Sequence, residues 1–406
     1  MNEIKIFKTR KYKNIDLYLR FSIPYRKNEK ALAAILAKLL GQASSNYPDK
    51  VSMTRAKDLL YGIDVLASSK SRADIVSFNV HYSFINPRFL DGITIDDYLS
   101  FIKETLCSCL IRNKDVKEAK RNICDSLKRR MDKPQVLANE RVVELISEDN
   151  DDFAIYGSGK GFIAQIQKVK LQEIKDFYAY LLDKAQLNIY LSGDIDDELA
   201  KRFAFLSLDK REEVKVGNLF HEYRDQGEII ERKKISQSYL SLVYATPYSK
   251  KHQDFFAWIL GNVFLGVVPT SLLFEEIREK LSLCYAISVH DFKNEGLVKI
   301  YTDIDGRNKD IVIAKINEQL RRLREMDYET EKLEIAKALF INSIMSSYDD
   351  LDILIDYYEE SYLSDFEYSL EEYCEKLNEV SKEDIARVFE NYRHVLTYML
   401  EGSENG

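Results

Sequence analysis

The chain has little of several residue types and patterns, and each scarcity excludes a class of protein. It has 5 cysteines in 406 residues. An odd number without a secretion signal predicts reduced thiols and a cytoplasmic setting, not a disulfide framework. The N-terminal stretch MNEIKIFKTRKYKN lacks the apolar core of a signal peptide. The most apolar run, FFAWILGNVFLGVVP, is shorter than the roughly 20 residues that a membrane span needs, so we expect none.

An excess of basic residues is also missing. Lysine and arginine number 59 against 67 aspartates and glutamates, which gives a net charge of −8. We therefore expect no nucleic-acid-binding surface. Hydrophobic residues make up 45% of the chain and charged residues 31%, as in globular proteins with sizeable cores. The length is too great for one ordinary core and predicts two domains.

The chain contains one pattern twice. An alternating strand, a Pro-Tyr turn and a long apolar-faced helix occupy residues 16–41 and again 238–266. A second helix and another alternating strand follow in each copy, then helices of mixed charge. Each half closes with an apolar strand, QLNIYLSGDI in the first and RHVLTYMLEG in the second. We predict an α+β fold of two homologous domains, residues 1–215 and 216–406, each an antiparallel sheet packed with helices.

The second copy places an arginine and a tyrosine seven residues apart, at a predicted junction between a helix and a strand. In LLFEEIREKLSLCYAISV, residues 272–289, the spacing of Phe274, Ile277 and Leu281 predicts a buried helical stripe. Arg278 lies beside that stripe, near the end of the helix.

The strand that follows carries Tyr285. From Leu283 onward the period becomes two, which predicts that Leu283, Tyr285, Ile287 and Val289 share one face. Arg278 and Tyr285 can then converge on one point. A structural interpretation stays open, with Tyr285 as a packed strand aromatic and Arg278 as a surface cation near the helix C-terminus.

The same segment resembles a stretch of the pitrilysin/insulinase family of zinc peptidases, whose metal motif is H-x-x-E-H. LFEEIREKLSLCY is similar to the family's LF-x-E-I-R-E-K-x-G-L-x-Y, with SLCY in place of the usual GLAY. The runs at 60–65 and 153–196 resemble further family segments in the same order. The resemblance covers almost the whole chain and implies an insulinase- or mitochondrial-processing-peptidase-like fold. It also implies that Arg278 and Tyr285 are the family's arginine–tyrosine pair.

The family's metal site is missing from this chain. The motif needs two histidines four residues apart, so that one helical turn presents both imidazoles to one ion. No two of the five histidines lie that close: His81, His221, His252, His290 and His394. Ala34 to Lys38 stand at the motif, which puts a cation where the metal would lie, and the later acidic ligand falls near Asp125 and Ser126. We expect this chain to bind no metal or other cofactor, and zinc to lie on a partner subunit.

The resemblance favours a non-catalytic subunit of a two-chain zinc metallopeptidase, inactive alone. Its partner is a homologous subunit that carries H-x-x-E-H, and an isolated chain can also form a homodimer. Arg278 and Tyr285 then bind a peptide or small-protein substrate and stabilise the oxyanion at the partner's zinc site. The alternative is a structural or binding protein with a peptidase-like fold, no proteolytic role and a relic pair. An enzyme with a relocated site is a third class, which no feature of the sequence supports.

Overall fold

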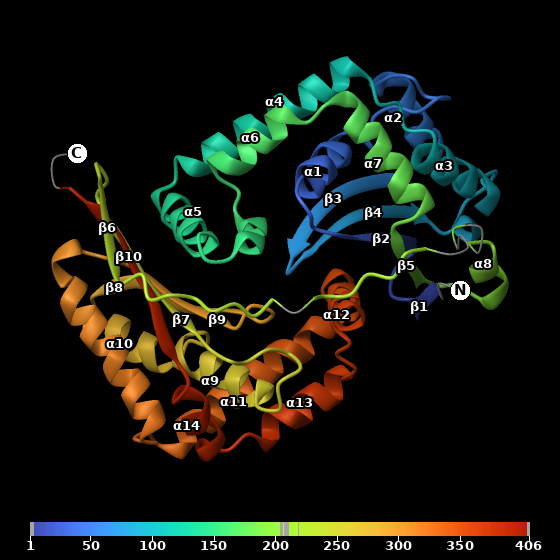
Figure 1. Cartoon of the computed structure of the whole chain (residues 1–406). Coiled ribbons are helices and arrows are strands. Elements are labelled where there is room, and N and C mark those ends of the chain that lie inside the picture. Colours follow the sequence, from blue (N-terminus) through green and yellow to red (C-terminus); the bar gives the residue numbers. More distant parts are fainter. Residues whose placement is uncertain (1–3, 204–205, 207–210, 218, 404–406) are drawn as a thin grey trace. The chain divides into compact units, whose positions relative to one another are not determined.

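The chain divides into two compact units, which share one architecture (Figure 1). The computed structural model describes residues 4–203, 206, 211–217 and 219–403. Unit 1 comprises Met1–Arg130 and Ile155–Val216, and unit 2 comprises Met131–Ala154 and Gly217–Gly406. No helix of the described residues is long and apolar enough to cross a membrane.

Unit 1 is built on a five-stranded sheet with the order β1-β5-β2-β4-β3. β1 runs parallel to β5, and the other neighbours pair antiparallel. On β2 the side chains of Leu17, Leu19 and Phe21 alternate into the core, as period two requires. The strands are β1 Ile4–Lys8, β2 Asn14–Pro24, β3 Asp64–Arg72, β4 Ile75–Ile85 and β5 Gln186–Gly193. The helices are α1 Glu29–Leu39, α2 Lys50–Leu59, α3 Ile95–Cys107, α4 Asn113–Met131, α6 Lys160–Lys168, α7 Leu171–Asp183 and α8 Asp197–Lys201.

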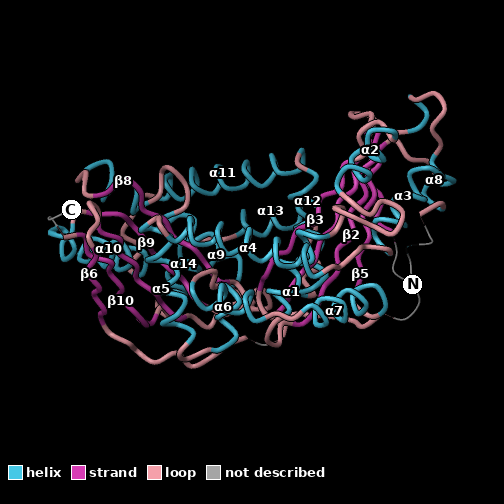
Figure 2. Tube along the Cα trace, turned by 90° about the horizontal axis from the view of Figure 1, so that it is seen from above, coloured by secondary structure: helices cyan, strands magenta, loops and turns pink. Residues whose placement is uncertain are grey.

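Unit 2 repeats this arrangement with the sheet order β6-β10-β7-β9-β8. β6 is parallel to β10 and the other pairs are antiparallel, so each strand has a counterpart at the same place in unit 1. Figure 2 shows the strands in magenta beside the helices in cyan. The strands are β6 Glu228–Lys233, β7 Ser238–Ala245, β8 Cys284–Phe292, β9 Leu297–Ile304 and β10 Arg393–Gly402. The helices are α5 Pro134–Ser147, α9 Phe255–Gly266, η4 Phe274–Lys280, α10 Lys309–Arg324, α11 Thr330–Ser346, α12 Leu351–Ser364, α13 Leu370–Glu379 and α14 Lys382–Phe389.

The duplication read from the sequence is confirmed: two mixed five-stranded sheets, each packed with helices, form the chain. One segment from the first half of the sequence, however, belongs to unit 2. Residues 131–154, which include α5, lie in unit 2. The Arg141 Nε donates to Glu231 Oε1 at 2.7 Å, and Lys299 Nζ donates to Asn139 Oδ1 at 2.9 Å. These contacts hold α5 against the strands of unit 2, although its sequence precedes the second copy of the pattern.

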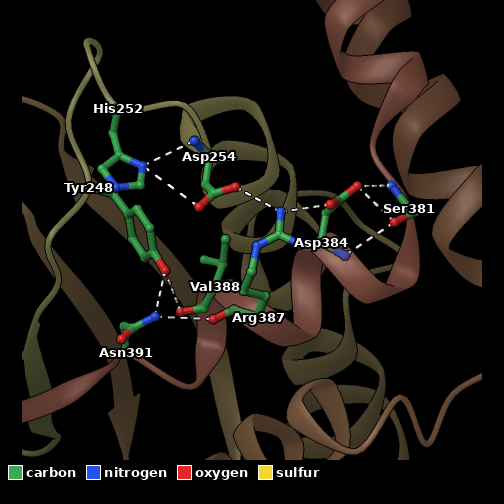
Figure 3. A network of polar contacts seen from close by, with 8 residues as sticks. All are labelled: Tyr248, His252, Asp254, Ser381, Asp384, Arg387, Val388 and Asn391. Atoms are coloured by element: carbon green, nitrogen blue, oxygen red, sulfur yellow. Dashed lines mark hydrogen bonds and ion pairs between the residues drawn. The ribbon is translucent and has the colours of Figure 1, made fainter.

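The Pro-Tyr turn of the second copy is anchored on α14 (Figure 3). Tyr248 is 1% exposed. Its hydroxyl donates to the carbonyl oxygen of Val388 at 3.4 Å and accepts from the side-chain amide of Asn391 at 2.9 Å. Because burying an unpaired hydroxyl is costly, these bonds specify how the turn after β7 meets the end of α14.

A second set of contacts joins the start of α9 to α14. Arg387 Nη2 donates to Asp254 Oδ1 at 2.8 Å and to Asp384 Oδ1 at 2.7 Å, and both bonds raise the pKa of Arg387. Ser381 caps α14 by accepting from the backbone amide of Asp384. Figure 3 shows the guanidinium between the two carboxylates.

Arg387→Ala is expected to lower the free energy of unfolding by about 1 kcal/mol, because it leaves the largely buried Asp254 carboxylate without its cation. The measurement is urea unfolding followed by circular dichroism. Arg307→Ala is the matched control, because Arg307 pairs with the nearby Asp305 on an exposed turn. An equal loss in both variants would contradict a specific role for the network.

Candidate functional site

Arg278 lies on a π-helix. Residues Phe274–Lys280 form this wide helix, η4, and Ile277 is its one fully buried side chain. The guanidinium carbon of Arg278 lies 4.4 Å from the centroid of the Phe274 ring. That cation–π contact supports the side chain from one side. The Arg278 side chain is 42% exposed, with Glu279 Oε1 3.8 Å from its Nε, so most of its N–H groups remain available to a ligand.

The prediction that Phe274, Ile277 and Leu281 form a buried helical stripe is wrong in part. Ile277 is buried as expected, but Phe274 is only partly buried and Leu281 is 40% exposed. The reason is the wider turn: a π-helix bonds i to i+5, so side chains seven residues apart no longer share a face. π-helical turns occur frequently at functional sites. The turn therefore moves Arg278 and Leu281 away from the positions that an α-helix would give them.

The turn between η4 and β8 forces a serine into a left-handed conformation. Ser282 has φ +52°, and its backbone amide bonds to the carbonyl of Arg278 at 3.1 Å. Ser282 occupies the place of glycine in the resembling GLAY pattern, and glycine adopts this conformation without strain.

Ser282→Gly is expected to raise the free energy of unfolding by about 0.5–1 kcal/mol, because it removes left-handed strain from a residue with a Cβ. Thermal unfolding measures the change. Ser288→Gly is the matched control: it lies in the regular part of β8, where glycine lowers stability. A loss of stability in Ser282→Gly would contradict the strain at this turn.

Tyr285 lies in a β-bulge at the start of β8, the edge strand of its sheet. Cys284 pairs with Ile304 and Ile287 pairs with Thr302, so that Tyr285 and Ala286 together oppose one residue, Asp303. Asp303 Oδ1 accepts from the Ala286 amide at 2.8 Å, and the Thr302 hydroxyl donates to the Ala286 carbonyl at 2.8 Å. These two side chains take over the backbone partners that the bulge removes from the ladder.

The bulge overturns the predicted face of Tyr285. Strict alternation placed Tyr285 with Ile287 and Val289, but the structure leaves Tyr285 78% exposed while Ile287 is 6% and Val289 5% exposed. An extra residue in one strand shifts every side chain before it to the other face. Packing therefore does not account for the aromatic ring of Tyr285.

Two side chains close to the pair in sequence, Cys284 and Glu276, have hydrogen-bond partners outside the pair. Burial raises the pKa of the Cys284 thiol, with the Asp303 charge adding to the rise and Arg278 opposing it, so Cys284 is a neutral thiol. The nearby Glu276 is already bound: hydrogen bonds from Lys280 and Lys315 hold the pKa of its carboxyl below the usual range. Its charge is compensated by these lysines, not by Arg278.

Arg278 and Tyr285 thus lie on consecutive elements, η4 and β8, both with exposed polar ends. No hydrogen bond between the two side chains occurs in the described part of the chain. The guanidinium offers several N–H donors in a fixed fork, and the phenol offers one O–H donor. This combination can hold a carbonyl oxygen and donate to a second oxygen on which charge develops. Neither residue type can itself supply a metal-activated water.

The position of the missing metal motif lies on α1. Ile35 and Leu36 are fully buried there, and Lys38 is exposed. Lys38 lines a pocket of about 190 Å³ together with Asp115, Glu118 and other residues, but neither Asp125 nor Ser126 lines it. The residues of α4 that line this pocket lie in its first three turns, N-terminal to Asp125 and Ser126.

These residues do not fit a zinc ion. Arg112 Nε lies 2.5 Å from Asp115 Oδ2, and Lys50 Nζ lies 3.0 Å from Glu118 Oε1, so both carboxylates are already paired with cations. Lys38 adds a third positive charge to the pocket. Within the described ranges, no group of three or more histidine, cysteine, aspartate or glutamate side chains could hold a metal ion.

Comparison with known proteins gives the family context of this site. Residues 168–340, which include Arg278 and Tyr285, match the family model described as the peptidase M16 inactive domain. The chain is 24% identical over 414 residues to the probable inactive metalloprotease YmfF of Bacillus subtilis, and the match covers 98% of this chain and 95% of that protein.

Solved structures share the fold over nearly the full length. A conserved protein from Enterococcus faecalis V583 aligns with a TM-score of 0.89 and 24% identity, covering 99% of this chain and 96% of that one. A peptidase M16 inactive domain from Pseudomonas fluorescens aligns with a TM-score of 0.78 and 17% identity, covering 98% and 95%.

Proposed function

We propose that this chain, which is homologous to an inactive metalloprotease of the M16 family, is the non-catalytic subunit of a two-chain zinc metallopeptidase. Its partner is a homologous subunit with an intact H-x-x-E-H motif, and the substrate is a peptide or small protein. The proposal assigns no metal to this chain, because the residues at the motif position do not suit one.

The observation that carries the proposal is the exposure of Tyr285. A large aromatic side chain with 78% of its surface exposed contributes little to the core. The bulge that exposes it is held by two side-chain hydrogen bonds to Ala286, which keep the irregular backbone in one conformation. Bulges that re-aim a side chain are over-represented next to active sites.

The chemistry of the pair suits peptide hydrolysis at a metal held by another subunit. Attack on a peptide carbonyl produces an oxyanion, and donors aimed at that oxygen lower the barrier. In the proposal the Tyr285 hydroxyl is such a donor. Arg278 binds a neighbouring carbonyl of the substrate through its forked N–H groups, and Phe274 supports the guanidinium.

The test is affinity isolation of the tagged full chain from its native cells, followed by mass spectrometry and a peptidase assay. The expected result is a co-purifying homologue that carries H-x-x-E-H, and an activity that needs both chains. Two results together would contradict the proposal: this chain is isolated alone, and a homologue with H-x-x-E-H is fully active without it. The structural or binding role would then be the better account.

A further inference from the structure

Unit 2 contains an apolar pocket away from Arg278 and Tyr285. It has a volume of about 210 Å³ and lies among α9, α11, α12 and α13. Every residue that lines it belongs to unit 2. A dry cavity of about 150 Å³ lined by leucine, isoleucine and phenylalanine is enough to bind benzene. The pocket therefore has room for one aromatic ring or a medium-length acyl chain.

Part of the pocket lining is aromatic, and its rings pack against one another. The Phe255 ring contacts Phe366 with centroids 5.3 Å apart and Tyr373 at 6.4 Å, and Tyr357 lies 6.5 Å from Tyr373. The Tyr357 hydroxyl donates to the carbonyl of Tyr368 at 2.5 Å, which ties α12 to the segment that follows it. Burial raises the pKa of Tyr357 to about 12, so this part of the lining stays uncharged at neutral pH.

Another part of the lining is aliphatic and reaches the surface. Ile344 from α11 lines the pocket together with Ile353 and Leu354 from α12. Ile353 is 50% exposed, although it lines the pocket. An exposed isoleucine at the mouth of an apolar pocket offers surface that a ligand can remove from water.

The polar groups of the pocket carry an excess of positive charge. Lys250 and Lys293 both line it, against the single carboxylate of Glu360. The Lys250 ammonium forms an ion pair with Glu360, and its side chain is only 7% exposed, so this pair is internally compensated. Lys293 is 36% exposed, and its ion pair with Asp291 has a long separation of 3.9 Å. One of the two lining lysines is thus only weakly compensated.

We propose that this pocket binds a small amphipathic carboxylate, with its ring or acyl chain against the aromatic and aliphatic lining and its carboxylate near Lys293. The binding does not depend on the peptidase role, since the pocket shares no residue with the Arg278–Tyr285 site. The walls supply affinity through buried apolar area, and Lys293 selects an anionic head over a cationic one.

Isothermal titration calorimetry of the full chain with butanoate, hexanoate and octanoate tests the apolar part. The affinity is expected to rise about fourfold for each added CH₂. Octylamine, which has the same chain and the opposite charge, is expected to bind at least tenfold more weakly than octanoate. Absence of octanoate binding, or equal binding of octylamine, overturns the proposal.

Two variants locate the binding in this pocket. Leu354→Trp fills the space and is expected to weaken octanoate binding at least tenfold, whereas Ile335→Trp, on α11 but outside the lining, leaves it unchanged. Lys293→Gln is expected to weaken octanoate binding about threefold without affecting the chain-length dependence. The side chain is partly exposed, so a small effect on folding is expected. Unchanged affinity in Leu354→Trp and Lys293→Gln places the ligand elsewhere and overturns the assignment.

Discussion

Tyr285→Phe is expected to lower the kcat of the assembled two-subunit peptidase by about 100-fold, the usual effect of removing one oxyanion donor. The substitution deletes a single hydroxyl and keeps the ring. Since the side chain is 78% exposed and the bulge is held by Asp303 and Thr302, the fold has no need of that hydroxyl. KM should change little, because the donor acts mainly on charge that develops in the transition state. Steady-state kinetics on a fluorogenic peptide measures both constants.

The matched control is Tyr362→Phe, which removes a hydroxyl from another exposed tyrosine of unit 2. It should leave kcat unchanged. Size-exclusion chromatography should show the same complex for both variants, which separates loss of chemistry from loss of assembly. Wild-type kcat in Tyr285→Phe would mean that the exposed tyrosine is a relic, and the binding role without proteolysis would then stand.

The duplicated architecture could be predicted because its signals are local. In β2, apolar residues at every second position predict a half-buried strand, and the same pattern in β7 predicts its counterpart. Repetition of the strand, turn and helix order then implies two similar sheets. The strand orders of the two units confirm this inference, because each strand of unit 1 has an equivalent neighbour in unit 2.

The geometry of the candidate site could not be predicted from local sequence patterns. Whether a helix bonds i to i+4 or i to i+5 depends on how its turns pack, and one buried residue, Ile277, gives too little periodicity to decide. A bulge likewise depends on partners distant in sequence, here Asp303 and Thr302. The sequence offered one indication of the turn. The resembling pattern has glycine at the position of Ser282, and a glycine in a pattern indicates a left-handed backbone such as Ser282 adopts.

Long-range packing also decides which residues surround Lys38. Counting along the sequence indicates Asp125 and Ser126, but the residues of α4 that line the pocket with Lys38 lie in its first three turns. Which residues of a helix line a pocket depends on how that helix packs against distant elements, which no local pattern encodes. The absence of a histidine pair, in contrast, follows from the positions of the five histidines in the sequence and needs no structure.

Arg278→Ala is expected to lower kcat/KM of the assembled peptidase by about 10- to 100-fold, since charge-assisted hydrogen bonds contribute about 1.5–3 kcal/mol. Because Arg278 binds a substrate carbonyl before and during the reaction, most of the loss should appear in KM. This split distinguishes Arg278 from Tyr285, whose loss should appear in kcat. The stability of the chain should change by less than about 0.5 kcal/mol, as for other exposed side chains.

Arg278→Lys is the informative companion variant. It keeps the positive charge but replaces the planar fork, which stacks on Phe274, with a single ammonium group. If Arg278 acts through its fork, the lysine variant should restore only a small part of kcat/KM. If it acts only through charge, lysine should restore most of it. Full activity in the alanine variant would contradict both, and would leave Tyr285 as the one group that this chain could supply to the partner's site.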